Sequence, residues 1–273
     1  MHLSQRLLVI ANFVPRGSTI ADIGTDHAYL PIYLVTEGVC PKAIGVDVHQ
    51  GPFEAAMRAV QEAGLADKIA VRLGDGLAVV QPGEADVVVI AGMGGGTIRG
   101  ILEAGPQVVA GLKRLILQPM VDSAHLREWL ICNGWPIADE ELVEEEGRLY
   151  EIIVAEKADV AVDAKPDFCA PKPNFSADKQ DFCVDKQDFP NSERDCFEAE
   201  IGLNTVLLEV GPKLVEKGHP LLRKHLDKLI QDRERVLKQI QNSASPLAKE
   251  KANKIGTWIS KLRSLKDSLI WTH

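Results

Sequence analysis

The sequence predicts an α/β domain with a mostly parallel seven-stranded sheet and an antiparallel edge hairpin, followed by an antiparallel pair of C-terminal helices. Three observations predict this fold class. Residues 19–31 have the pattern of a buried strand, a tight loop and the start of a helix. Residues 85–91 are almost all apolar, as expected of a strand covered on both faces. After residue 221, leucine and isoleucine recur at helical spacing.

Strands and helices are expected to alternate through the first part of the chain. Helices are predicted at 4–14, from 24–28 onward, 53–63, 97–104 and 124–132, and strands at 19–23, 42–47, 69–73, 85–91, 112–118, 135–143 and 148–155. The last two strands surround an acidic turn, which predicts the edge hairpin.

Length and composition set the domain organisation. The chain has 273 residues, of which 45% are hydrophobic, enough for one large domain and a smaller one. We expect an α/β domain at 1–156, an insert at 157–203, a return segment at 204–212 and a basic helical domain at 213–273.

The expected location is cytoplasmic. No apolar run reaches membrane-spanning length, and Leu7–Ala11 is too short for a signal peptide and lacks a cleavage pattern. The five cysteines lie far apart, with no CxxC pair to suggest zinc or redox chemistry. We therefore expect no membrane partner and no bound metal. A monomer is a further expectation, although no sequence feature determines the oligomeric state.

The charge is distributed unevenly. Residues 213–273 carry fourteen Lys and Arg against six Asp and Glu, whereas residues 1–212 carry seventeen against thirty-three, so a net charge of −8 conceals a basic C-terminal part. This part is the expected surface for a polyanion. A solvated helical face with no partner is the alternative.

The loop at residues 24–28 indicates the charge of a ligand. The rival interpretation is a dinucleotide site, which requires Gly-x-Gly-x-x-Gly so that the backbone can approach a pyrophosphate. In this chain Asp26 and His27 occupy the positions of the second glycine and its neighbour. A carboxylate there repels a pyrophosphate and suits a cofactor with a sulfonium and an ammonium group. The loop resembles the first motif of Rossmann-like methyltransferases that use S-adenosylmethionine. The other alternative is a plain strand-to-helix turn.

Further acids follow the next two strands. Asp47 ends the second strand roughly 20 residues beyond the loop, where a carboxylate can hold ribose hydroxyls. In the same superfamily an acid after the third strand commonly meets the adenine amino group, and Asp75 has that place. A helix N-cap for Asp47 and a turn-stabilising role for Asp75 are the alternatives. Together with Asp22, three acids at three successive strand ends support one another, because ligands bind outside the carboxyl ends of parallel strands.

The fourth strand runs into Gly92-Met-Gly-Gly-Gly96. Methyltransferases that act on exocyclic amines typically place an Asn or Asp, two prolines and an aromatic residue here, and this chain has neither the amide nor the aromatic residue. A glycine-rich floor with the thioether of Met93 leaves room for a flat ring. A glycine-rich turn before a helix is the alternative. Gln118 is expected to offer its amide at the same rim.

The whole pattern is similar to one family. Thr25-Asp-His-Ala-Tyr-Leu-Pro31, Ala91-Gly-Met-Gly-Gly95, Leu117-Gln-Pro119 and Glu209-Val-Gly-Pro212 resemble the bacterial tRNA adenine N1-methyltransferases of the TrmK type over residues 1–156 and 204–270. The resemblance implies a Rossmann-like class I domain, S-adenosylmethionine as donor, a small coiled-coil domain for tRNA, and adenine 22 near the D-arm as target. Met120 departs from the pattern, in which asparagine is frequent.

The motifs and the resemblance together predict the site. Cofactor contacts are expected from Asp22, Gly24, Thr25, Asp26, Asp47, Val48, Asp75, Gly76, Ala91, Gly92 and Met93. Substrate contacts are expected from His27, Tyr29, Gly94, Gly95, Gln118, Pro119, Arg223, Lys224, Lys228 and Lys254. Asp26, His27 and Tyr29 are the expected catalytic residues. Alternatives are a helix-start role for His27 and core filling for Tyr29.

The insert contains four seven-residue units that begin at Lys165, Lys172, Lys179 and Lys186. Each unit has one strongly apolar residue and several units contain proline, so we expect a flexible, repeat-expanded loop and not a coiled coil. Binding of a partner through the repeated phenylalanines is the alternative.

Two other functional classes stay open at this point. A methyltransferase for a small molecule would not need the basic helices and would show no salt-dependent affinity for RNA. The other class is a non-catalytic RNA-binding protein that holds the cofactor.

Overall fold

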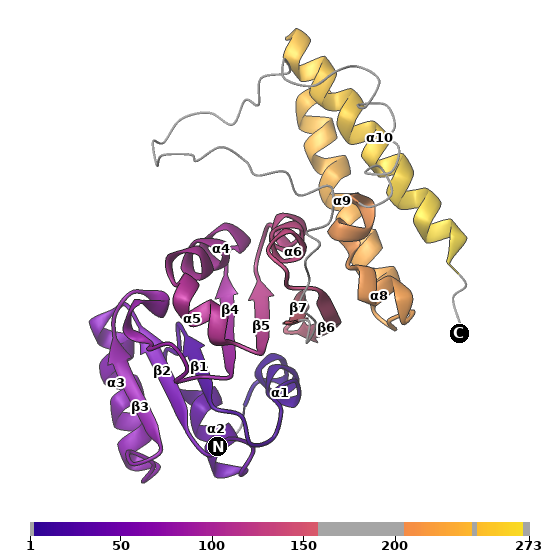
Figure 1. Ribbon diagram of the computed structural model, residues 1–273. Coiled ribbons are helices and arrows are strands. Elements are labelled where there is room, and N and C mark those ends of the chain that lie inside the picture. Colours follow the sequence, from indigo (N-terminus) through magenta and orange to yellow (C-terminus); the bar gives the residue numbers. More distant parts are fainter. Residues whose placement is uncertain (1–2, 158–204, 242–244, 270–273) are drawn as a thin grey trace.

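The structure, a computed structural model, describes residues 3–157, 205–241 and 245–269. Its centre is a seven-stranded sheet with strand order β3-β2-β1-β4-β5-β7-β6 (Figure 1). The strands are β1 Ile20–Ile23, β2 Ala43–Asp47, β3 Ile69–Leu73, β4 Val87–Met93, β5 Arg114–Pro119, β6 Ile137–Glu145 and β7 Arg148–Glu156. The helices are α1 Gln5–Asn12, α2 Tyr29–Thr36, α3 Gln50–Glu62, the 3-10 helix η1 Gly76–Val79, α4 Gly95–Ala104, α5 Pro106–Gly111, α6 Ser123–Cys132, α8 Pro212–Glu216, α9 Leu222–Gln241 and α10 Pro246–Ser268.

The predicted fold class is confirmed. Strands β1 to β5 pair in parallel, and β7 pairs antiparallel with both β5 and β6. Helices α5, η1 and α8 were not predicted, because each has at most six residues and too little periodicity to stand out.

Helices cover both faces of the sheet. One face packs against α1, α2 and α3 through residues such as Ile10, Leu34 and Val60. The other packs against η1, α4, α5 and α6 through residues such as Leu77, Ile98 and Leu130. The central strands are therefore buried on both sides, which explains the continuous apolar run of β4.

The strand order creates a crevice. The chain runs outward from β1 through β2 to β3 and then returns to the other side of β1 as β4. The loops after β1 and β4 thus diverge at the carboxyl ends of adjacent strands. In open α/β sheets, ligands bind at such a switch point.

The C-terminal helices lie against the β6 edge of the sheet, far from β3 (Figure 1). Helices α9 and α10 are antiparallel, because Arg263 pairs with Glu234 and Lys266 with Asp227. Leu142 of β6 joins their hydrophobic core. The predicted helical hairpin is thus confirmed, whereas the coiled coil and the proposed domain boundaries stay predictions. The predicted insert at 157–203 lies, apart from its first residue, outside the described residues.

The packing of α10 can be tested with one pair of variants. Leu262 is fully buried in the hairpin core, whereas Leu247 of the same helix is 77% exposed. Leu262→Ala is expected to lower the free energy of unfolding by about 2–5 kcal/mol, because it leaves a cavity. Leu247→Ala should change it by less than about 0.5 kcal/mol. Urea unfolding followed by circular dichroism measures both, and equal effects would contradict the packing of α9 against α10.

Candidate functional site

A buried carboxyl group lies at the end of β1. Asp22 is 7% exposed, and its Oδ2 accepts a hydrogen bond from Thr25 Oγ1 at 2.7 Å. Thr25 packs over Gly45 of β2, where an added Cβ would lie 3.0 Å from Thr25 Cγ2. Burial raises the pKa of Asp22 to about 6, and the negative charge of Asp47 adds to the increase while the Thr25 bond opposes it.

The loop after β1 is held in an unusual backbone conformation. The N–H groups of Gly24 and Thr25 both donate to Val46 O, at 2.8 and 3.0 Å. Asp26 and Ala28 have φ of 52° and 54°, which non-glycine residues adopt only where the surroundings impose it. Residues 24–28 thus form the tight loop that was predicted to open the helix. Helix α2 begins at Tyr29, after a loop that is fixed to the end of β2.

Asp47 connects the ends of β2 and β1. Its Oδ2 accepts the backbone N–H of Asp26 at 3.2 Å, and its Oδ1 accepts that of His49 at 3.0 Å. The N-cap of α3 is His49, so the alternative that Asp47 caps this helix is wrong. Alternation along the strands places Asp22 and Asp47 on the sheet face that carries Ile20 and Ala43. The two carboxyl groups therefore line the same side of the crevice.

The outer part of this loop presents polar and aromatic groups to solvent. The rings of His27 and Tyr29 stack at a centroid distance of 5.1 Å and an interplanar angle of 14°. His27 Nε2 lies 3.7 Å from Asp26 Oδ1. Tyr29 is 43% exposed, so it does not fill the core, contrary to the alternative interpretation.

The expected adenine end of the site is open. Val48 is 53% exposed after β2, and Asp75 is exposed after β3. Asp75 precedes η1 and makes no side-chain capping bond. Gly76, with φ of +52°, lies so close to Ile101 that an added Cβ would be 2.9 Å from its Cγ2.

The opposite wall contains a β-bulge, which corrects the prediction for Gln118. The pairing of β4 with β5 shifts between Ala91 and Met93, so Gly92 leaves the ladder. Its N–H donates to Gln118 Oε1 at 3.1 Å. Gln118 is fully buried, and its Nε2 donates to Pro119 O at 3.0 Å. Gln118 thus satisfies the bulge and does not offer its amide at the rim.

The glycine-rich floor is fixed by the segment after β5. Gly95 donates its N–H to Val121 O at 2.9 Å, and a Cβ on Gly95 would lie 2.5 Å from Asp122 O. Gly95 and Pro119 are buried, so they support the floor and do not form its surface. Gly24 and Met93 meet at the crevice, where a Cβ on Gly24 would lie 2.4 Å from Met93 Cε.

Val121 and Arg6 were missed from the sequence, and Met120 was noted only as a departure from the family pattern. Met120 and Val121 are 46% and 59% exposed beside the floor, although both are apolar. Arg6 donates to Gln118 Oε1 and lies 5.3 Å from the Tyr150 ring centroid. The sequence offered one indication for Arg6. It lies three residues after Leu3 and four before Ile10, so helical spacing places it on the same side as these two buried side chains.

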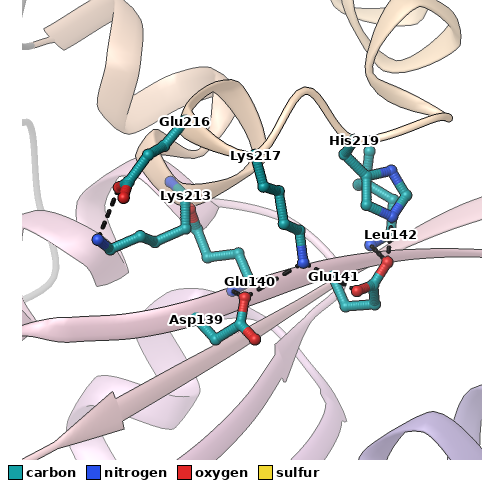
Figure 2. A network of polar contacts seen from close by, with 8 residues as sticks. All are labelled: Asp139, Glu140, Glu141, Leu142, Lys213, Glu216, Lys217 and His219. Atoms are coloured by element: carbon teal, nitrogen blue, oxygen red, sulfur yellow. Dashed lines mark hydrogen bonds and ion pairs between the residues drawn. The ribbon is translucent and has the colours of Figure 1, made fainter.

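Part of the basic surface faces the protein itself. Lys224 pairs with Glu144 at 2.6 Å, and Lys228 reaches Leu149 O at 3.5 Å. Figure 2 shows Lys217 and His219 directed to Asp139 and Glu141 of β6 in the same way. Lys224 and Lys228 were predicted to contact substrate, but here Lys224 pairs with an acid of the edge hairpin and Lys228 contacts a backbone carbonyl group of β7.

Other basic side chains point away from the sheet. Arg223 is exposed, and Lys254 is exposed in a surface ion pair with Glu250 at 2.9 Å. A groove of about 530 Å³ on α10 is lined by Lys254, Trp258 and Lys261, among others. Arg233 and Lys261 lie 5.6 and 5.9 Å from the Trp258 ring centroid.

The described part of the chain has neither a metal-binding group of side chains nor a membrane-spanning helix. Within residues 3–157, 205–241 and 245–269, no three or more His, Cys, Asp and Glu side chains are grouped so that they could hold a metal ion. No helix in these ranges combines the length and apolar character needed to cross a membrane.

Comparison with known proteins agrees with this geometry. Residues 3–153 match the model of a methyltransferase domain family. The chain is 48% identical over 159 residues to the tRNA (adenine(22)-N(1))-methyltransferase of Bacillus subtilis, which covers 58% of this chain and 67% of the relative. The chain belongs to this methyltransferase family.

Solved structures extend the similarity of this methyltransferase to the C-terminal helices. The crystal structure of Bacillus subtilis TrmK has a TM-score of 0.75 and 34% identity, over 97% of this chain and 99% of the other. A Streptococcus pneumoniae relative in complex with S-adenosyl-L-methionine has a TM-score of 0.73 and 30% identity, over 97% of this chain and all of the other.

The environment of Asp22 predicts a pH dependence. Because its pKa is raised from 3.8 to about 6, its protonated form stabilises the fold fully below pH 4, and this contribution is lost as the pH rises through 6. Relative to Asp22→Asn, the wild type should lose up to about 3 kcal/mol of unfolding free energy between pH 4 and pH 7. Urea unfolding across this range measures it.

Exposed Asp67→Asn is the control for the loss of a surface carboxyl group. A flat difference for Asp22→Asn would contradict the buried, proton-binding state of this carboxyl group.

Proposed function

We propose that the protein transfers a methyl group from S-adenosylmethionine to N1 of adenine 22 in tRNA. Membership of the methyltransferase family supports the reaction, and the named activity of the Bacillus subtilis relative supports the target. The structural observation that carries the proposal is the pair Asp22 and Asp47 beneath a positive-φ loop at the switch point.

The side chains present fit this cofactor. Carboxylates on adjacent strand ends favour its ammonium group and ribose hydroxyls and disfavour a pyrophosphate. Gly24 leaves the space that its Cβ would fill beside Met93. Asp22, Thr25 and Asp47 would hold the methionine and ribose parts, and Val48, Asp75 and Gly76 would surround the adenine. When bound, the cofactor supplies an electrophilic methyl group on a sulfonium.

The protein then has to position the acceptor. Adenine N1 attacks through an in-plane lone pair, so no side chain has to remove a proton as the C–N bond forms and the S–C bond breaks. Positive charge moves from the sulfur to the adenine ring, and the Asp26 carboxylate stabilises it throughout. Orientation of the two reactants contributes most of the rate.

The surface around the floor suits an unpaired base. The stacked rings of His27 and Tyr29 offer an aromatic face on one side of the crevice. Met120 and Val121 offer an apolar face on the other. Since N1 lies on the Watson–Crick edge, the adenine must leave its pair or stack before it enters.

The outward basic residues of α9 and α10 bind the tRNA backbone in this proposal. Arg223 and Lys254 are exposed there, and Lys261 and Trp258 line the groove on α10. Phosphate contacts of this kind orient the RNA without reading its sequence. A monomer working in the cytoplasm is part of the proposal.

The charge of Asp26 is the test of the catalytic assignment. Asn tolerates positive φ well, so Asp26→Asn keeps the loop and removes only the charge. We expect kcat for tRNA methylation to fall by about tenfold or more, with tRNA affinity unchanged. Exposed Glu146, with φ of 49°, provides the matched control Glu146→Gln. Full activity of Asp26→Asn would contradict its catalytic role.

Lys254→Gln tests the tRNA surface. The variant should weaken tRNA binding and reduce the slope of log affinity against log salt by about 1, because one phosphate contact is lost. Cofactor affinity should not change. Lys68→Gln, beside β3 at the other edge of the sheet, should leave both quantities as in the wild type. Fluorescence anisotropy with labelled tRNA measures the slopes, and identical slopes for Lys254→Gln and the wild type would count against this surface.

A further inference from the structure

A buried ionic cluster joins the C-terminal helices to the sheet. Arg127 of α6 is fully buried, and its Nε donates to Glu140 Oε1 of β6 at 2.6 Å. Its Nη2 donates to Glu151 Oε2 of β7, also at 2.6 Å. Burial opposes ionisation of Glu151, but the charges of Arg127 and His225 and the hydrogen bonds from Arg127 and Ser123 together outweigh it and hold the pKa of this carboxyl group below its usual value. We call Arg127, Glu140 and Glu151 the junction cluster.

The junction cluster holds the chain that leads into α8. Arg127 Nη1 donates to the carbonyl oxygens of Leu208 and Glu209, at 2.7 and 3.3 Å. Glu140 Oε2 accepts the backbone N–H of Lys213 at 2.8 Å, below the start of α8 (Figure 2). Gly211 has φ of +101°, and a Cβ there would lie 3.1 Å from both Arg127 Nη2 and Glu140 Oε2. These contacts explain the motif Glu209-Val-Gly-Pro212.

The same cluster also holds the substrate floor. The second carboxylate oxygen of Glu151 accepts a hydrogen bond from Ser123 Oγ at 3.0 Å. Ser123 begins α6 directly after the segment that binds the floor, in which Met120 donates its N–H to Met93 O at 2.8 Å and Val121 accepts from Gly95. An unbroken series of contacts therefore runs from α8 to the glycine-rich loop.

Stability alone does not explain this arrangement. Burying three charged groups costs desolvation free energy, and well-packed apolar residues often stabilise a fold as much or more. A guanidinium with fixed donor directions instead imposes one geometry on all its partners. We propose that Arg127 is a positioning residue for methyl transfer: through Glu140, Glu151 and Ser123 it fixes the orientation of the tRNA-binding helices relative to the loop that receives the adenine.

This inference rests on the proposed function, because only a substrate that contacts both the helices and the floor is sensitive to their relative orientation. A misplacement of about 1 Å can cost about a hundredfold in rate. The expected signature is a lower kcat with tRNA while the cofactor site, formed by other elements, keeps its affinity.

Arg127→Lys tests the positioning role, because an ammonium keeps the charge but cannot donate to two carboxylates and two carbonyl groups in fixed directions. We expect kcat at saturating tRNA and cofactor to fall by about tenfold to hundredfold, with the cofactor Kd within about twofold of the wild type. Ser123→Ala leaves both ion pairs of Arg127 intact and should lower kcat severalfold. Arg99→Lys, in an exposed ion pair with Glu103, is the matched control.

The kcat values of these variants decide whether Arg127 is a positioning residue. The proposal is overturned if both variants keep kcat within about twofold of the wild type, or if kcat falls only in proportion to a loss of folded protein or of cofactor affinity. It is supported if kcat falls alone, and if the double variant loses less than the product of the two single effects, as residues in one network should. If the wild-type protein methylates no tRNA, the proposed function itself fails, and the inference fails with it.

Discussion

The placement of two acids at the ends of adjacent parallel strands determines the character of the site. Asp47 accepts hydrogen bonds from the backbone N–H groups of Asp26, in the loop after β1, and of His49, after β2. Asp22 is buried on the adjacent strand, and its pKa is raised to about 6. The first loop then adopts positive φ at Asp26, which turns a third carboxylate outward. A group of carboxylates at these strand ends attracts a cationic cofactor and repels a phosphate-bearing one. The glycine-rich loop on the other side of the switch point completes the same crevice.

The uneven charge of the chain has two physical roles. Some of the C-terminal basic residues neutralise the acidic β6–β7 hairpin, as Lys217 and Lys224 do. Others, such as Lys254 in its surface ion pair with Glu250, are exposed on the helices. The first group attaches the helices to the sheet, and the second forms the surface that we propose for tRNA. Both groups are needed if one tRNA is to contact the helices and the crevice at once.

Local patterns predicted most of the fold and the place of three acids at the ends of strands. Hydrophobic periodicity and turn residues placed all seven strands, and the spacing of Asp22, Asp47 and Asp75 placed the acids at strand ends. Features that depend on register or long-range packing could not be predicted. The buried role of Gln118 follows from the bulge at Gly92, and the pairing of Lys224 follows from the docking of α9 on β6. The conformation of the loop before α2 follows from backbone bonds to β2, which no local propensity encodes.

The central claim is that the crevice is built for a sulfonium cofactor. Isothermal titration calorimetry of the wild-type protein with S-adenosylmethionine and, in the same buffer, with a nicotinamide dinucleotide tests it most directly. Saturable binding of S-adenosylmethionine and no heat from the dinucleotide is the predicted result. Binding of the dinucleotide without binding of S-adenosylmethionine would contradict the electrostatic assignment of Asp22, Asp26 and Asp47.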